Sequence, residues 1–231
     1  RYCGEPDVAG CEACIATWGG YLGEDLTVPD LISRSQREFR QAGTVMVPSR
    51  DTAQRMARHF PQTSFLPVPL EDDAVLLSNV SGRTGVISGR ALRICVVGGL
   101  SRWKGYDDLL SMAQCIRAMS LPVELVLVGH TPDDETLIAA GVKVTGEYQE
   151  DEVLGLIREQ SADIGFIPSV APETWCYALG ILWKSGLEVL CFDIGAQSER
   201  VRCSDRGAVV PLGMPVEFLV RFILRRWGPV S

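Results

Sequence analysis

A carboxylate follows a proline-containing turn in the segment Pro168–Tyr177, which reads PSVAPETWCY. Glu173 stands where we expect a helix to begin. The first backbone amides of a helix have no partners inside it, so they can hold an anion. The amides concerned belong to Thr174, Trp175, Cys176 and Tyr177. A carboxylate beside such a site can accept hydrogen bonds from sugar hydroxyls, although a first-turn acid that merely favours the helix start is the alternative.

Glycines and cations follow another apolar run in the segment Gly98–Gly105, which reads GGLSRWKG. A glycine such as Gly99 lets a ligand approach the backbone closely, and Arg102 and Lys104 could meet a phosphate there. Lys104 is also one of few lysines in a chain whose cations are mostly arginines. The pattern is neither the dinucleotide-binding G-x-G-x-x-G nor a P-loop. A strand-to-helix turn with solvated cations is the alternative.

Two further positions follow expected strands. His130 comes directly after VELVLVG and could hydrogen-bond a ligand, or it is an ordinary loop histidine. Tyr148 comes after VKVTGE and could flank a nucleobase, or it is a half-exposed turn tyrosine.

Three cysteines, Cys3, Cys11 and Cys14, cluster near the start of the chain. They could be ligands of a structural zinc ion, with His59 a conceivable fourth. One disulfide and free thiols are the other two interpretations. Cysteines inside apolar runs, such as Cys95 and Cys191, are expected to be buried small hydrophobic residues.

Apolar runs alternate with helical patterns from Arg90 onward. We expect strands in LRICVVGG, VELVLVGH, VKVTG, DIGFIPS, EVLCFDIG and AVVPL. We expect helices over Tyr106–Met119, Asp133–Ala140, Asp151–Gln160, Thr174–Ser185, Ser198–Arg202 and Val216–Trp227. This alternation predicts an α/β fold with a doubly wound parallel sheet, in which ligands bind at the carboxyl ends of the strands.

The residues before Arg90 are less regular. We expect a helix from about Asp30 to Gly43, a strand in TVMVPS, a helix in RDTAQRMARHF and an extended SFLPVPL, but no clear element in the first 30 residues. Glycines and serines predict a linker or exposed hairpin over 71–90. The expected division is therefore 1–70, 71–90 and 91–231.

Composition limits the classes of function. The chain has 231 residues, a net charge of −7 and 46% hydrophobic residues. Such a composition argues against a disordered chain, and the acidic balance argues against nonspecific nucleic-acid binding. No apolar run is long enough to span a membrane. The chain begins at Arg1 rather than Met, and we expect it to be a piece of a larger protein.

Taken together, these strand ends resemble the retaining family-4 glycosyltransferases of the GT-B fold. GGLSRWKGYDDLL is similar to the family segment G-R-L-x-x-x-K-G-x-x-x-L-L, and VELVLVGH to its L-x-I-V-G-D strand. VKVTGEYQEDEVLGLI is similar to V-x-F-x-G-x-x-x-x-x-E-L-x-x-x-Y. PSVAPETWCYALGILWKSGLEVLCFDIGAQSERV is similar to the E-x-F, E-A and G-x-x-E region, and most resembles bacterial transferases of O-antigen and related surface polysaccharides.

The resemblance covers about Arg90–Trp227 and implies a nucleotide-sugar donor-binding domain, the C-terminal one of two Rossmann-like domains. VMVPSRDTAQRMARHF resembles the last strand and helix of the acceptor-side domain, which implies that the rest of that domain precedes Arg1 and that the cysteine cluster belongs to it. The expected acceptor is a polysaccharide or lipid-linked glycan. The expected location is the cytoplasm, with the inner face of the membrane as a place for peripheral association.

The resemblance also implies roles. Lys104 and the amides of Thr174 to Tyr177 would stabilise the leaving nucleoside diphosphate, and Glu173 would orient the donor sugar. No metal or other cofactor is required. We expect this fragment alone to transfer sugar poorly or not at all.

Two positions depart from the family pattern. Gly99 stands where the family has an arginine, for which Arg102 is a candidate substitute, and Ile181 stands where it has a second glutamate. These departures leave open a non-catalytic donor-binding or scaffolding domain in polysaccharide assembly. A nucleotide-sugar epimerase is a further alternative.

Overall fold

The computed structural model describes residues 2–20, 26–78 and 89–228. The chain forms two compact units, Arg1–Pro69 (unit 1) and Leu70–Ser231 (unit 2). Each unit is described by itself.

Unit 2 is built on a six-stranded, entirely parallel sheet. Its strands are β3 (Leu92–Val97), β4 (Val123–Val128), β5 (Val142–Val144), β6 (Ile164–Ile167), β7 (Val189–Phe192) and β8 (Gly207–Val210). All four residues of β6 and of β7 are buried. Continuous apolar strands of this kind are typical of a parallel sheet that is covered on both faces.

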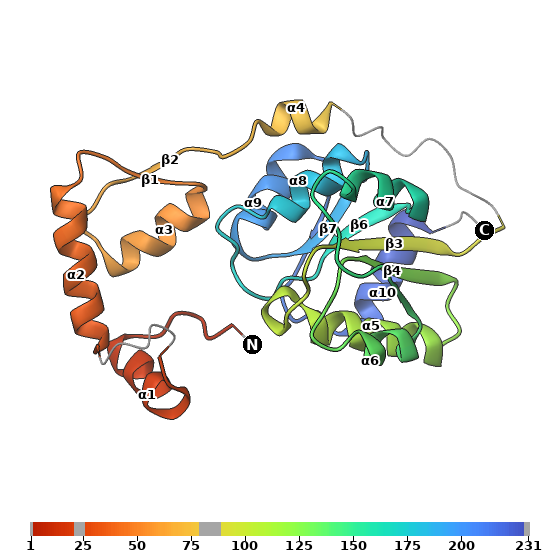
Figure 1. The fold of residues 1–231 in the computed structure, drawn as a ribbon, viewed down its shortest axis with the longest axis horizontal. Helices are drawn as coiled ribbons and strands as arrows, with labels where there is room; N and C mark the ends of the chain where they lie inside the picture. The colour runs from red at the N-terminus through yellow and green to blue at the C-terminus, as the bar shows by residue number, and fades with distance from the viewer. Residues whose placement is uncertain (1, 21–25, 79–88, 229–231) are drawn as a thin grey trace. The chain divides into compact units, whose positions relative to one another are not determined.

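Helices cover both faces of the sheet. These are α5 (Tyr106–Ala118), α6 (Asp134–Ala140), α7 (Val153–Gln160), α8 (Tyr177–Lys184), α9 (Gly195–Ser204) and α10 (Val216–Trp227), with a 3-10 turn η1 (Arg102–Lys104) before α5. Figure 1 shows α5, α6 and α10 on one face, and α7, α8 and α9 on the other. The predicted α/β doubly wound fold is therefore confirmed.

The order of the strands locates the switch point of the sheet. The sheet runs β5-β4-β3-β6-β7-β8, so successive strands are laid down outward from β3 in one direction and then outward from β6 in the other. This is the strand order of the Rossmann fold, in which the crevice between the two halves receives the ligand. The loops that follow β3 and β6 are thus the place to look for a site.

Unit 1 contains α1 (Val8–Trp18), α2 (Val28–Gln41), β1 (Val45–Val47), α3 (Arg50–His59) and β2 (Phe65–Pro67). β1 and β2 form a parallel two-stranded sheet. Phe39 packs edge-on against Phe60 and Phe65, at ring-centroid distances of 5.0 and 5.6 Å. The expectation that the first 30 residues lack an element was wrong. Asp7 caps α1, and Thr27 forms a capping box with Asp30 at the start of α2.

The expected linker over 71–90 is also different in the structure. Helix α4 (Asp73–Leu77) lies within it, is capped by Asp72, and packs against α8 and α9. The sequence missed this helix because it has a single turn, and its position is set by long-range ion pairs that are described below. Residues 79–88 lie outside the described residues.

Candidate functional site

Two residues from different strand ends meet in unit 2. The Nζ atom of Lys104, in η1 after β3, lies 2.8 Å from Oε2 of Glu173, in the loop after β6. The Lys104 side chain is 48% exposed and that of Glu173 is 14% exposed. Because β3 and β6 are hydrogen-bonded neighbours at the switch point, the fold itself brings these two predicted residues together.

The loop that carries Lys104 is fixed to the loop that carries Glu173. The carbonyl of Trp103 accepts hydrogen bonds from the Val170 amide, at 3.1 Å, and from the Ser169 hydroxyl, at 3.3 Å. Gly105 has a φ of 93°, and a Cβ there would lie 2.0 Å from the Pro168 carbonyl oxygen. Only glycine fits this approach, so Gly105 allows the two loops to pack directly on each other.

The N-terminal end of α9 holds the Glu173 backbone. The Ala196 amide donates to the Glu173 carbonyl at 2.9 Å, and the Glu173 amide donates to the buried Gln197 side chain at 3.2 Å. Gln197 in turn donates to the Ala171 carbonyl. Sequence reasoning did not single out Gln197, since its partners lie more than 20 positions away and no motif residue marks it.

Helix α8 begins later than predicted. The expected start was Thr174, but the first helical residue is Tyr177, and Glu173 lies in the preceding loop. Cys176, the residue before the helix, has a left-handed backbone with φ 71°, which is uncommon for a residue other than glycine. Of the four amides predicted to hold an anion, that of Tyr177 therefore belongs to the first helical turn, and the others belong to the loop.

Trp175 packs into the protein behind the loop. Its indole N–H donates to Glu71 at 3.1 Å, and the Arg200 guanidinium lies 3.8 Å from the centre of its ring. Arg200 also donates to the carbonyls of Trp175 and Cys176 at 3.0 Å, and pairs with Asp73. The Trp175 side chain therefore supports the loop from behind.

The acidic partners of Trp175 and Arg200 are Glu71 and Asp73, which lie in the segment around α4. Burial alone would raise the pKa of Glu71, but hydrogen bonds from Lys184 and Trp175 and the nearby positive charges outweigh it, so the pKa lies below its usual value.

Burial, with the neighbouring Glu173 carboxylate, raises the pKa of the Cys176 thiol. Cys176 is thus a neutral, buried side chain rather than a reactive thiolate.

A cavity of about 500 Å³ opens beside the Lys104–Glu173 pair. Its lining includes most of the predicted residues of the β6–α8 loop, together with residues that the sequence did not single out. The lining residues are Leu70, Trp103, Lys104, Ser169, Ala171, Pro172, Glu173, Thr174, Trp175, Cys176, Tyr177 and Ala178. A concave site with apolar walls and a few charged groups is typical of small-molecule binding.

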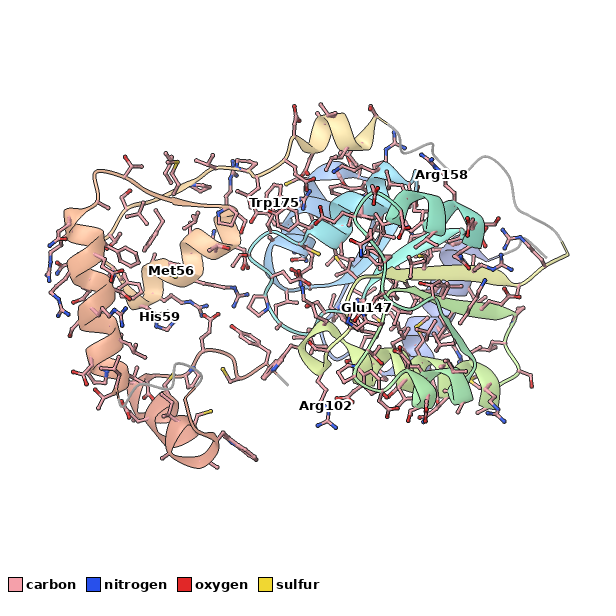
Figure 2. The ribbon with its side chains drawn as sticks, in the orientation of Figure 1. Met56, His59, Arg102, Glu147, Arg158 and Trp175 are labelled. Carbon is pink, nitrogen blue, oxygen red and sulfur yellow. The ribbon has the colours of Figure 1, made fainter. Side chains whose placement is uncertain are left out.

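Arg102 does not join this cavity. Its side chain is 83% exposed, its nearest acidic partner is Asp107 at 3.9 Å, and Figure 2 shows it pointing away from the body of unit 2. In this structure it therefore does not take the place of an arginine at position 99. A Cβ at Gly99 would make ordinary contacts with the His130 ring, so no steric crowding explains this glycine.

The remaining predicted residues lie at the ends of β3, β4 and β5, outside the lining of the cavity. The His130 ring lies beside Gly99, and its Nε2 atom is 4.0 Å from Oε1 of Glu147. Tyr148 packs against the hydrophobic core, which leaves it half-buried, and burial raises its pKa. This half-buried position fits the alternative of a turn tyrosine, and the nucleobase-flanking role stays a prediction.

Two other sequence expectations concern Ile181 and the cysteine cluster. Ile181 packs against the hydrophobic core from α8 and offers no hydrogen-bonding group there. Cys3, Cys11 and Cys14 are free thiols in this structure, which corresponds to the third of the three interpretations. Within residues 2–20, 26–78 and 89–228, no group of three or more His, Cys, Asp or Glu residues is arranged to hold a metal ion.

Comparison with known proteins identifies the family. The chain matches the glycosyl transferases group 1 family over residues 91–224, which is more than half of its length. The chain belongs to this family. The match covers the whole sheet of unit 2 and both residues of the Lys104–Glu173 pair. No curated protein sequence matches the chain significantly.

Solved glycosyltransferase structures share the fold of this family member. Anabaena HepE in complex with UDP is similar, with 17% identity and a TM-score of 0.64, over 88% of this chain and 60% of HepE. A glycosyltransferase from Rickettsia africae is 14% identical with a TM-score of 0.63, over 87% of this chain and 57% of its own. WaaG, a glycosyltransferase involved in lipopolysaccharide biosynthesis, is 16% identical with a TM-score of 0.58, over 95% and 63%.

The chain spans less than two thirds of the length of these structures. Their likeness shows that the parallel sheet of unit 2 has the architecture of a GT-B glycosyltransferase domain. Among the described residues, no helix is long and apolar enough to cross a membrane.

Proposed function

We propose that this chain contains the donor-binding domain of a retaining glycosyltransferase that transfers a sugar from a nucleoside diphosphate sugar to a polysaccharide or lipid-linked glycan. The observation that carries the proposal is the Lys104–Glu173 pair, which lies at the switch point of a Rossmann-type sheet and lines a cavity. The family membership supports the reaction class. UDP bound to HepE supports the donor class, and the involvement of WaaG in lipopolysaccharide biosynthesis supports a surface glycan as the acceptor.

In this proposal, Lys104 and Glu173 bind different parts of the donor. When the sugar–phosphate bond breaks, negative charge develops on the leaving diphosphate, and a cation already in place stabilises it. Lys104 has that role, with the first turn of α8 beside it. Glu173 accepts hydrogen bonds from the sugar hydroxyls and orients the ring. Because the net charge is −7, phosphate binding depends on this local arrangement and not on a basic surface.

Calorimetric titration of the chain with UDP tests the diphosphate role. Lys104→Ala should raise the Kd at least about tenfold, since a hydrogen bond to a charged group contributes about 1.5–3 kcal/mol. Lys143→Ala is the matched control, because Lys143 is an exposed lysine on β5 that does not line the cavity. An equal effect of both substitutions would show a general charge effect and contradict the proposal.

Ile181 favours a second candidate, a domain that binds the donor without catalysis. An isoleucine packed against the core cannot replace the hydrogen bonds of a glutamate. The two candidates differ in turnover. Incubation of a protein that contains this chain and an acceptor-binding domain with UDP-glucose and a glycan acceptor yields a glycoside that keeps the donor's anomeric configuration if the protein is a retaining transferase, whereas a binding-only protein yields none.

A further inference from the structure

Trp103 differs from the other tryptophans of unit 2 in how its indole is used. Trp175, Trp183 and Trp227 are buried, and each indole N–H donates to a protein oxygen. Trp103 is 49% exposed, and no hydrogen bond joins its indole N–H to any part of the chain that the structure describes. Trp103 also lines the cavity, so a half-exposed aromatic residue whose indole donor the described residues leave free lies beside the Lys104–Glu173 pair.

The backbone of Trp103 is nevertheless rigidly placed. Its carbonyl accepts two hydrogen bonds from the β6–α8 loop, and Gly105 allows that loop to pack two residues further on. An aromatic residue whose backbone is fixed on both sides loses little conformational freedom when it binds a ligand. Such a residue is suited to recognition.

The neighbours of Trp103 indicate which part of a ligand it would meet. Lys104 follows it in the chain, and Glu173 lines the same cavity. In a nucleoside diphosphate sugar, the sugar is bonded directly to the terminal phosphate. If Lys104 holds the phosphates and Glu173 holds sugar hydroxyls, then Trp103, which lines the same cavity, lies near the sugar that is bonded to those phosphates.

We infer that Trp103 is a sugar-recognition residue: the indole face packs on the C–H face of the donor's pyranose ring, and the indole N–H donates to a ring hydroxyl. An aromatic ring buries apolar C–H surface while its polar edge keeps a hydrogen bond, which is the combination that tryptophan offers. The inference rests on the proposed function, since it requires a donor held by the Lys104–Glu173 pair. It goes further by assigning a residue that selects for the sugar rather than for the nucleotide.

Titration of the chain with UDP and with UDP-glucose tests the inference. Trp103→Ala should raise the Kd for UDP-glucose about tenfold, or about 1.4 kcal/mol at 25 °C, and leave the Kd for UDP unchanged. Trp103→Phe should retain part of the affinity for UDP-glucose, because it keeps a ring but loses the donor. Phe218→Ala is the matched control, since Phe218 is an aromatic residue on α10 that is 63% exposed and does not line the cavity.

The other outcomes separate the two claims. If Trp103→Ala changes neither Kd, the inference is overturned and the proposed function stands. If it weakens UDP and UDP-glucose equally, Trp103 contacts the nucleotide, and the inference is again overturned. If the unaltered chain binds neither ligand, the proposed function fails and the inference fails with it.

Discussion

Unit 2 buries the interior of a six-stranded sheet on both faces, whereas in unit 1 the buried residues within the described ranges are Val47, Ser49 and Phe60. Unit 1 has one two-stranded sheet, and two strands without a substantial core are marginally stable. Unit 2 holds its candidate site by backbone contacts between loops at a switch point. The loops of the candidate site are thus held by a large buried core, and within the described residues unit 2 has such a core whereas unit 1 does not.

We expect the largest difference in stability when the two units are produced as separate proteins. Residues 70–231 alone should unfold in one cooperative transition and should still bind UDP, because the sheet, the cavity and the support of the loop all lie within unit 2. Residues 1–69 alone should show no cooperative transition. Thermal unfolding followed by circular dichroism measures both, and cooperative unfolding of residues 1–69 would show that unit 1 has a sufficient core of its own.

Substitution of Arg200 should give the next largest change in the stability of unit 2. Its guanidinium is almost fully buried between Trp175 and Trp183, and it pairs with Asp73. Arg200→Ala removes the partner of Asp73 and leaves the buried carbonyls of Trp175 and Cys176 without their donor, so the free energy of unfolding of unit 2 should fall by about 3–5 kcal/mol. Urea unfolding measures the change.

Arg225→Ala is the control for Arg200, since Arg225 is an exposed arginine in the last turn of α10. Its free energy of unfolding should change by less than about 0.5 kcal/mol. Equal effects of the two substitutions would mean that the buried cluster adds nothing to the stability of unit 2.

Acidification should give the smallest change in the stability of unit 2, and it tests the contribution of Glu71. Its pKa is lowered in the folded state, so its contribution to stability is complete above the unfolded pKa of about 4.3 and is lost as the pH falls through the folded pKa. Unit 2 should therefore lose stability below about pH 4. In Glu71→Gln the urea midpoint should depend less steeply on pH in this range, and an unchanged slope would exclude Glu71 as a source of the dependence.

Sequence patterns predicted the six strands of unit 2 and the helices after Arg90, because apolar strands and helical periodicity are local features, but they missed the single-turn helix α4. Lys104 and Glu173 were also predictable, since each follows a strand and parallel strands place their carboxyl ends at one edge. The support of the loop was not predictable, because Arg200 and Asp73 lie 127 positions apart and Trp175 meets Glu71 across 104 positions. The start of α8 at Tyr177 depended on the left-handed backbone of Cys176, which no residue type at that position indicates.

A double-mutant cycle on UDP affinity tests the central claim, that Lys104 binds the diphosphate of the donor and that Glu173 acts on UDP only through its ion pair with Lys104. In the free chain Glu173 pairs with the Lys104 charge. Glu173→Gln releases that charge, so it should lower the Kd for UDP severalfold when Lys104 is present and have no effect in the Lys104→Ala background. The same change in both backgrounds would contradict the account, because Glu173 would then act on UDP independently of Lys104.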